Sequence, residues 1–392
     1  MTLQCCAHVA RHVARAGAAL TMRTIRASRS MRPVQPFQEE FPLNTNKRLA
    51  AMLLAIVAIV AIASTTATAK QSTPKAGSDI KVGLVTDIAG LGDKSFNFLA
   101  GEGVKQAKKK YGITYDITVS KSGSSYAPNI TNYALKGYDL VIAVGFLEEQ
   151  ALGQVAKKFP DTKFAIVDDS TSVKALKGLK NVEGLLYKEW ESGYLAGYLA
   201  GLFENTKAKG LNSANVMSTV GGIAIPPVDH YIAGFQAGAK AADPGVKLLN
   251  GYSGDFIAQD KCQGLAQQQI AQGSDIIFQV AGQCGLGAIN AARDKGYWGI
   301  GVDTDQSKQV GSKQLLVSAT KGVDVSVVDV IGQVVNNKFR GGKDLLLGVN
   351  EKGAGIQGIN SAVPADIKAK VAALLVKMKA GKVKIPTVPI VK

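Results

Sequence analysis

Histidine and cysteine are scarce in this chain, and their scarcity excludes several kinds of chemistry. The 392 residues include three histidines and four cysteines. A metal enzyme with several histidine ligands, or an array of zinc fingers, needs more of these side chains than the sequence offers. We therefore expect neither a metal centre nor a zinc-dependent fold.

The motifs of nucleotide-dependent and hydrolytic enzymes are also missing. No G-x-x-x-x-G-K-[ST] sequence is present, and the glycine-rich turn at 89–92 lacks the third glycine of a dinucleotide fingerprint. No G-x-S-x-G element accompanies His230, which we expect to be a capping or surface residue at the start of a helix. Because no nucleophile is paired with a base, the sequence does not predict an enzyme.

Basic residues outnumber acidic ones, by 46 Lys and Arg to 30 Asp and Glu, which gives a formal charge of +16. A lysine cluster at 105–110 ends a predicted helix, where the helix dipole favours cations. It lacks the interleaved aromatic residues and the motifs of nucleic-acid-binding proteins. We expect the net charge to be spread over helix ends and surface, and we expect no nucleic-acid partner.

The segment 44–69 has the three parts of a secretory signal. Lys47 and Arg48 precede an uncharged apolar run at 49–63, and small residues follow at 67–69. The run is shorter than the roughly 20 residues needed to cross a bilayer, so we favour a signal peptide over the alternative, a retained anchor. The protein is therefore expected to be exported, to the periplasm or the outer face of the cell membrane.

Residues on either side of this signal complete the expected N-terminal organisation. The segment 1–43 has no periodic pattern and is interpreted as a mis-assigned or dispensable extension, and 70–79 reads as a flexible leader. No cysteine follows the apolar run, so no lipid-anchoring residue is available there and a soluble exported protein is expected.

From residue 80 onward, short apolar runs alternate with amphipathic stretches, a pattern typical of βαβ units and a doubly wound α/β fold. The predicted strands are 80–86, 139–145, 163–168, 275–281 and 299–303. The predicted helices are 96–110, 148–158, 190–203, 231–242, 259–272, 285–295 and 323–338. These units are too many for one sheet, so we predict two similar lobes, with a division near 183–190 and a return near 319–323.

Polar and aromatic residues follow the predicted strands, where ligands bind in open α/β sheets. After the first strand come Asp87, Phe96 and Asn97, which suit a flat polar ligand. The alternative is helix capping by Asp93 or Ser95, with Phe96 in the core. The other candidates at strand ends are Asp168, Phe256, the turn at 281–287 that contains Gly282, Asp303 and Lys321.

Several stretches in order resemble the basic membrane protein family of ABC-transporter substrate-binding proteins, which includes bacterial purine nucleoside receptors. The matching stretches are TDIAGLGDKSFN, ALKGYDLVIAVGF, ESGYLAGYLAG, GGIAIPPVDHYIAGFQAGAK, AGQCGLGAINAARDKG, GVDTDQS and SATKGVDVSV, within 80–338. The resemblance implies a type I periplasmic-binding-protein fold with two Rossmann-like lobes, three crossovers and a ligand cleft. The expected lobes are 80–188 with part of 320–345, and 189–319 with part of 346–392.

The resemblance also implies roles for the strand-end residues. Phe96 and Phe256 would stack on the two faces of a purine. Asp87, Asn97 and Asp168 would hydrogen-bond the ligand, beside Gly282. Asp303 would bind ribose hydroxyls, with Lys321 nearby.

The chain departs from the family pattern at 282–285 and in the stretch after Phe256, and both departures introduce cysteines. Cys262 begins one predicted helix and Cys284 follows the next strand, so both lie at the same edge of a βαβ unit. Export into an oxidising compartment favours a disulfide, and the alternative is two free thiols.

The resemblance therefore implies a monomeric, non-enzymatic receptor without a cofactor, which delivers a nucleoside to an ABC permease in the inner membrane. Because the departures flank the predicted site, a sugar, a signalling molecule or another heterocycle is an alternative ligand. A nucleoside-cleaving enzyme is a further alternative.

Overall fold

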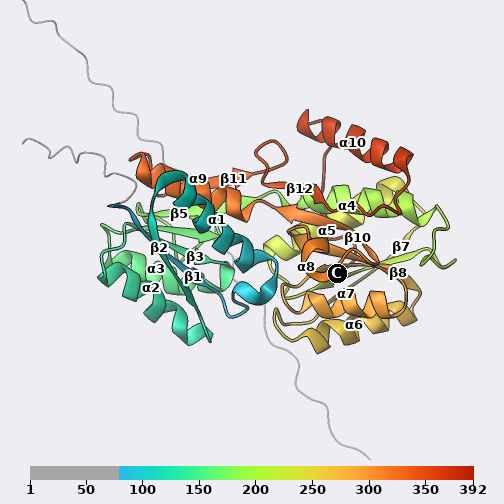
Figure 1. The fold of residues 1–392 in the computed structure, drawn as a ribbon, viewed down its shortest axis with the longest axis horizontal. Helices are drawn as coiled ribbons and strands as arrows, with labels where there is room; N and C mark the ends of the chain where they lie inside the picture. Colours follow the sequence, from blue (N-terminus) through green and yellow to red (C-terminus); the bar gives the residue numbers. More distant parts are fainter. Residues whose placement is uncertain (1–78) are drawn as a thin grey trace, which may run out of the picture. The chain divides into compact units, whose positions relative to one another are not determined.

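The computed structural model of the protein describes residues 79–392, which contain two six-stranded sheets (Figure 1). The predicted extension at 1–43, the predicted signal at 44–69 and all but the last residue of the predicted leader at 70–79 lie outside the described residues. The α/β architecture predicted from the sequence is confirmed, and each sheet with its helices forms one lobe.

The first sheet has the strand order β11-β5-β4-β3-β1-β2, and all its strands are parallel. Its strands are β1 (Lys81–Thr86), β2 (Thr114–Val119), β3 (Leu140–Val144), β4 (Lys163–Val167), β5 (Val182–Tyr187) and β11 (Asp344–Leu347). Every residue of β3 is buried, because this strand is central and helices cover both faces of the sheet.

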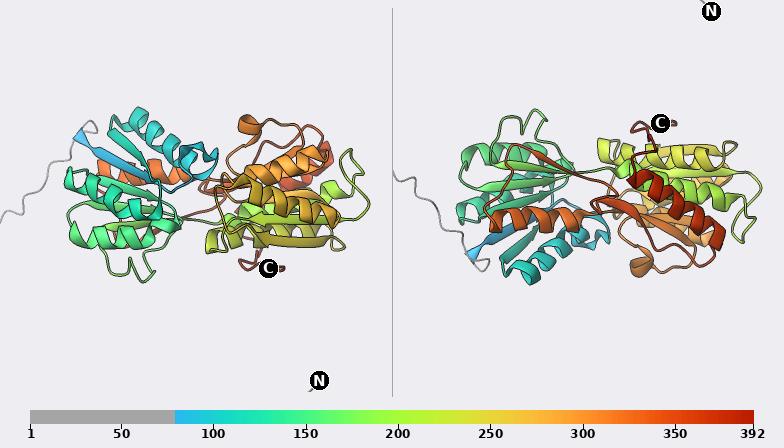
Figure 2. Two further views of the ribbon diagram at one scale, coloured as in Figure 1. Left: turned by 90° about the horizontal axis from the view of Figure 1, so that it is seen from below. Right: turned by 90° about the horizontal axis from the view of Figure 1, so that it is seen from above.

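Two helix pairs cover the first sheet. One face packs against α1 (Phe96–Tyr111) and α9 (Val323–Val335), and the other packs against α2 (Tyr126–Leu135) and α3 (Glu149–Lys158) (Figure 2). Apolar side chains recur on the inner faces of these helices, so a separate core fills each side of the sheet.

The second sheet repeats the arrangement, with the order β12-β10-β9-β8-β6-β7. Its strands are β6 (Val216–Gly221), β7 (Lys247–Tyr252), β8 (Ser274–Val280), β9 (Trp298–Asp303), β10 (Leu315–Lys321) and β12 (Ala354–Gln357), of which β12 is antiparallel to β10. Its helices are α4 (Glu189–Glu204), α5 (Pro226–Ala242) and α10 (Ala365–Lys379) on one face, α6 (Gln259–Ala271) and α7 (Gly285–Asp294) on the other, and the short α8 (Ser307–Val310).

The chain passes between the two sheets three times. It leaves the first sheet after β5, returns after β10, and crosses again between β11 and β12. As a result α9, which follows β10 of the second sheet, packs on α1 of the first lobe, whereas α4, which follows β5 of the first sheet, packs on α5 of the second. Each lobe therefore contains one helix, α9 or α4, that directly follows a strand of the other lobe in the chain.

The start of α5 differs from its prediction. The helix begins at Pro226, five residues before the predicted start at residue 231. Proline fits the first turn of a helix because the backbone N–H groups there have no intrahelical acceptor. None of the described helices is long and apolar enough to cross a bilayer.

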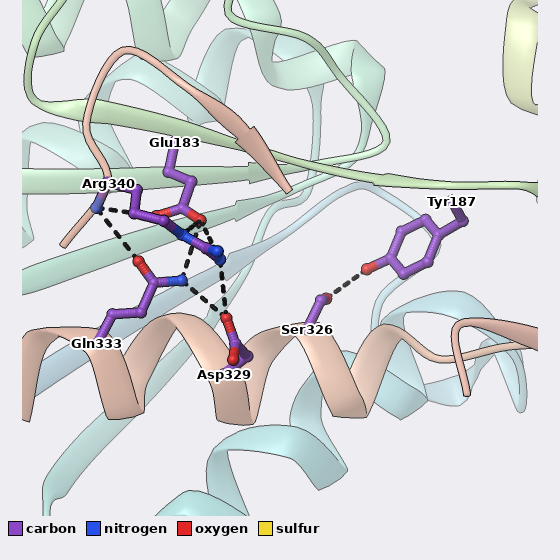
Figure 3. A network of polar contacts seen from close by, with 6 residues as sticks. All are labelled: Glu183, Tyr187, Ser326, Asp329, Gln333 and Arg340. Carbon is purple, nitrogen blue, oxygen red and sulfur yellow. Dashed lines mark hydrogen bonds and ion pairs between the residues drawn. The ribbon is translucent and has the colours of Figure 1, made fainter. Parts of the chain in front are cut away.

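An ion-pair network around one buried carboxylate fixes α9 and the β11 connection to the first lobe (Figure 3). The Glu183 side chain is fully buried on β5, and its Oε1 accepts hydrogen bonds from Arg340 Nη2 at 3.1 Å and Gln333 Nε2 at 3.0 Å. Arg340 Nη2 also donates to Asp329 Oδ2 at 3.0 Å. The carboxylate of β5 is thereby joined to α9 and to the loop after it, 150 or more residues further along the chain.

We predict that Arg340→Met lowers the free energy of unfolding by about 1–2 kcal/mol, because it removes the cation facing a buried carboxylate while Arg340 itself is partly exposed. Urea denaturation measures this loss. Lys338→Met, at an exposed neighbour, is the matched control. The double variant with Glu183→Gln should recover part of the loss, since a neutral amide is easier to bury. Equal stabilities of the Arg340 and Lys338 variants would contradict the prediction.

A disulfide joins Cys262 of α6 to Cys284, which directly precedes α7, with their Cα atoms 5.5 Å apart. Both cysteines are fully buried. The bond joins residues that are 22 positions apart in the sequence, and it links the two helices that cover one face of the second sheet.

Replacing both residues, Cys262→Ala with Cys284→Ala, should lower the free energy of unfolding by about 3 kcal/mol, because the unfolded chain loses a cross-link over a loop of this length. Urea denaturation of the variant and of the reduced wild type should give similar losses. In the unreduced, unfolded full-length chain, thiol titration should detect no more than Cys5 and Cys6. Four titratable thiols would refute the bond.

Candidate functional site

All eight residues that the sequence nominates as ligand contacts line one cavity at the carboxyl ends of both sheets. The accessible space in the cavity is about 70 Å³. The eight residues are Asp87, Phe96, Asn97, Asp168, Phe256, Gly282, Asp303 and Lys321. Parallel strands of both lobes end here, so side chains far apart in the sequence meet in one place. Their contact with a ligand remains a prediction.

Asp87 is fixed at the tip of β1 by its neighbours. Its Oδ1 accepts hydrogen bonds from the Ala89 backbone N–H and from Asn97 Nδ2, both at 2.8 Å. Asn97 Nδ2 also donates to Asp93 Oδ2 at 3.1 Å, so both amide hydrogens of Asn97 are engaged. Asn97 therefore orients Asp87, and its amide has no donor left for a ligand.

The two interpretations of the segment before α1 are both partly right. Asp93 caps the helix, since its carboxylate accepts the backbone N–H groups of Ser95, Asn97 and Phe98. Phe96 is only partly buried: it packs against the core of the first lobe and also lines the cavity. Ser95 Oγ donates to Asp303 Oδ2 at 2.5 Å, a hydrogen bond that joins the two lobes at the cavity.

Phe256 forms the aromatic wall that the second lobe contributes. Its ring lies against Gly222, where a Cβ atom would come within 2.3 Å of the ring carbons, so the position of the ring requires glycine there. Its carbonyl oxygen accepts the Cys284 backbone N–H at 3.0 Å. Gly282, in the left-handed region with φ of 54°, completes the turn beside it. The disulfide and the aromatic wall thus share one turn.

Asp168 and Asp303 occupy equivalent positions in the two lobes. Asp168 directly follows β4 and Asp303 ends β9, the third strand of each sheet in the order given above. Both have φ of 63°, a left-handed conformation that Asp adopts more readily than most residues. Asp168 Oδ1 is buried and has no hydrogen-bond partner among the described residues, so it can accept a hydrogen bond from a ligand.

Lys321 is buried at the centre of the site, with 3% of its side chain exposed. Its Nζ lies 2.7 Å from Asp168 Oδ2 and 3.4 Å from Glu189 Oε1, and 5.3 Å from the ring centroids of Phe96, Tyr187 and Tyr231. Burial lowers the pKa of Lys321, but the carboxylates of Asp168, Glu189 and Asp303 outweigh it and raise the pKa above its ordinary value. The ammonium therefore stays charged and links both lobes.

Acidic groups outnumber this cation in the site. Burial raises the pKa of Asp168 to about 7 although Lys321 opposes the shift, and burial likewise raises the pKa values of Asp87 and Asp303. Burial raises the pKa of Asp93 to about 6, against the effect of its hydrogen bonds. Four carboxyl groups and one ammonium line the cavity. Such a lining favours a neutral ligand rich in hydrogen-bond donors and disfavours an anion.

The sequence prediction missed several cavity residues. Tyr231 is buried, and its hydroxyl donates to Asp303 Oδ1 at 3.3 Å. Phe146 and Leu147, which come shortly after the end of β3, also line the cavity. The search for polar and aromatic residues after each strand would have found Phe146. It could not find Tyr231, which lies in the second turn of α5.

His230 is not a helix cap, and its partly exposed side chain has a specific partner. It lies inside α5, and its Nδ1 is 3.2 Å from Oε2 of Glu189, whose other carboxylate oxygen faces Lys321. Its ring packs edge-on against Trp190 with centroids 5.1 Å apart. Within residues 79–392, no group of three or more His, Cys, Asp or Glu is arranged to hold a metal ion.

A family model described as "ABC transporter substrate-binding protein PnrA-like" matches residues 80–388. Among curated relatives, the "ABC transporter nucleoside-binding protein BmpA" of Lactococcus lactis is 31% identical, over 86% of this chain and 98% of the relative. The "CD4+ T-cell-stimulating antigen" of Listeria innocua is 30% identical, over 82% of this chain and 92% of the relative.

Solved structures agree with this fold. An ABC-transporter solute-binding protein from Aeropyrum pernix superimposes with a TM-score of 0.70 at 26% identity, covering 79% of this chain and 93% of that one. A second, from Conexibacter woesei, gives a TM-score of 0.61 at 26% identity, covering 79% and 99%. Both the fold and the family expected from the sequence are thus confirmed. The chain belongs to the Bmp family of PnrA-like ABC-transporter substrate-binding proteins.

Proposed function

We propose that this substrate-binding protein binds a purine nucleoside between its lobes and delivers it to an ABC permease in the inner membrane. The observation that carries the proposal is the pairing, in one cavity, of two phenyl rings from different lobes with several carboxyl groups. Phe96 comes from the first lobe and Phe256 from the second. Rings on two sides suit a flat base better than a bare sugar, and stacking contributes about 1–3 kcal/mol per base.

The carboxyl groups suit the sugar of such a ligand. Asp168 and Asp303 are acceptors at equivalent ends of the two sheets, and Asp168 Oδ1 has no partner among the described residues. Ribose hydroxyls are donors that can satisfy these oxygens. We assign Asp303 to the ribose, Asp87 to hydrogen-bonding the ligand, and Asn97 to holding Asp87 in place.

Delivery requires the ligand to be bound and then released. We propose that the ligand binds one lobe first and that closure about the three crossings adds the contacts of the other. The hydrogen bond from Ser95 to Asp303 and the Lys321–Asp168 ion pair both join the lobes, so they support the closed form. Opening would have to break or rearrange both.

The printed name of the Lactococcus lactis relative, a nucleoside-binding protein, supports the same ligand class. We further propose that the protein acts as a monomer, after export to the periplasm or the outer face of the cell membrane. The cavity groups bind and orient a ligand, and we assign no catalytic role to any of them.

Isothermal titration with adenosine, guanosine, inosine, cytidine and ribose tests the proposal. We expect at least one purine nucleoside to bind with a dissociation constant on the order of 1 μM or below, and ribose to bind far more weakly. If none of the five binds below about 1 mM, the nucleoside proposal fails. Recovery of the bound nucleoside intact after long incubation would separate a receptor from a nucleoside-cleaving enzyme.

Removing either aromatic wall should weaken purine nucleoside binding. We predict that Phe96→Ala and Phe256→Ala each raise the dissociation constant about 10- to 100-fold, because each removes one stacking face. Phe98→Ala is the control, since Phe98 lies on the same helix and does not line the cavity. An unchanged affinity in the Phe96 variant would assign that ring to packing alone.

A phosphate group should oppose binding. We predict that a purine nucleoside 5′-monophosphate binds at least about 100-fold more weakly than the matching nucleoside, because the buried carboxyl groups would face a second anion. Competition titration at fixed pH and ionic strength measures the ratio. Equal affinities would mean that the phosphate lies outside the cavity, away from Asp168 and Asp303.

A further inference from the structure

Within residues 79–392, the net positive charge is concentrated at the C-terminal end and is not evenly spread over the surface as the sequence analysis expected. Residues 365–392 contain seven lysines and one acidic residue, Asp366, a net charge of +6. Residues 79–364 contain 29 basic and 27 acidic residues, a net charge of +2. Helix α10 and the tail that follows it therefore carry most of the net charge of the described chain.

Helix α10 lies on the outside of the second lobe, next to α4 (Figures 1 and 2). Its buried residues, Ile367, Val371 and Met378, recur at helical spacing and pack into the core of that lobe. The opposite face is apolar and exposed. It consists of Ala369, Ala372, Ala373 and Val376. Val376 has 68% of its surface exposed, which is unusual for a large aliphatic residue in a well-packed helix.

Lysines flank this exposed apolar face on both sides. At 100° per residue, Lys368 and Lys379 fall on one flank of α10, and Lys370 and Lys377 on the other. Lys370 forms an ion pair with Asp366, with Nζ 3.0 Å from Oδ2. Long lysine side chains on both flanks of an apolar strip can extend their ammonium groups toward one plane.

The tail after α10 also combines lysines with exposed aliphatic residues. Exposed Lys382 and Lys384 follow the helix. The Gln236 side chain of α5 holds the end of the tail. Its Oε1 accepts a hydrogen bond from the backbone N–H of Val391, and its Nε2 donates to the Val391 carbonyl oxygen, both at 2.9 Å. Val388 and Ile390 alternate outward, with 61% and 57% of their surfaces exposed. With Val376 of α10, three of the seven exposed large hydrophobic residues in the described chain thus lie within residues 365–392.

We propose that this basic C-terminal surface, formed by α10 and residues 380–392, docks on a membrane that contains anionic lipids. Lysines attract the headgroups, and the outward valine and isoleucine side chains enter the boundary with the acyl chains. A soluble polyanion would use the lysines but not the exposed aliphatic residues, so the combination favours a lipid surface. Docking would keep the receptor next to the membrane independently of which ligand the cavity binds.

Hydrogen exchange of the full chain with vesicles tests the proposal, because it reports on residues 365–392 directly. One set of vesicles is phosphatidylcholine alone and the other contains about 30% phosphatidylglycerol as the anionic lipid. We expect protection of 365–392 on the anionic vesicles only, lost as salt increases. The apolar run at 49–63 is common to all variants, so differences between variants isolate the C-terminal surface.

Two sets of substitutions make the test decisive. Substituting Gln at Lys370, Lys377, Lys379, Lys382 and Lys384 should lower the affinity for anionic vesicles at least about 10-fold. Gln at Lys105, Lys108, Lys109 and Lys110, exposed lysines at the end of α1, should change it little. Equal losses in both variants, equal protection on neutral vesicles, or no protection at 365–392 would each overturn the proposal.

The paired variant Val376→Ser with Val388→Ser separates lipid docking from binding of a soluble polyanion, because it keeps every charge. We expect its affinity for anionic vesicles to fall about threefold or more, while its affinity for polyphosphate stays that of the wild type. Wild-type binding to the vesicles would overturn docking on lipid and leave a polyanion as the partner of the lysines.

Discussion

The buried ammonium of Lys321 is the interaction on which the site depends. Moving an ammonium from water into a protein interior costs several kcal/mol, on the order of what a whole domain gains from folding, unless carboxylates surround it. Asp168 of the first lobe and Glu189 and Asp303 of the second supply that surrounding. Because the partners come from both lobes, satisfying this one charge also brings the two sheet edges together.

The two lobes repeat one architecture but contribute different chemistry to the cavity. The third strands end in Asp168 and Asp303, two carboxyl groups in the same backbone conformation. Strands β5 and β10, the second in each sheet order, end differently, in Tyr187 and in Lys321, and these two residues lie in contact. One lobe therefore places an aromatic ring where the other places a cation. The equivalent backbone positions give a symmetric frame, and the side chains make the site asymmetric.

Much of the fold and site could be predicted from the sequence because both follow from where strands end. Runs of Val, Ile and Leu marked the central strands β1, β3, β4, β8 and β9, and the polar and aromatic residues near strand ends gave eight positions that line one cavity. The edge strands β2 and β7 escaped because their burial is partial and their sequences are mixed. The central strands β5 and β6 escaped as well, because polar residues such as Glu183 and Thr219 interrupt their apolar runs. Tyr231 escaped because its position depends on how α5 packs, which no local pattern encodes.

The structure adds detail to one expectation, the role of Asn97, and corrects another, the even spread of the charge. Asn97 lines the cavity, but Asp87 and Asp93 already use both of its amide hydrogens, and only a structure reveals this. The lysine-rich composition of 365–392 can be read directly from the sequence. The total charge of the whole chain concealed it, because residues 1–78 carry a further +8 while the basic and acidic residues of 79–364 almost balance.

The exchange of α4 and α9 between the lobes has a consequence for how the protein folds and comes apart. The first lobe needs β1 and α9, more than two hundred residues apart in the chain, before one face of its sheet is fully covered. Contacts of such long range slow folding and make it cooperative. The lobes are thus separate in shape but not in assembly, and no single cut in the backbone would release either of them as a complete folding unit.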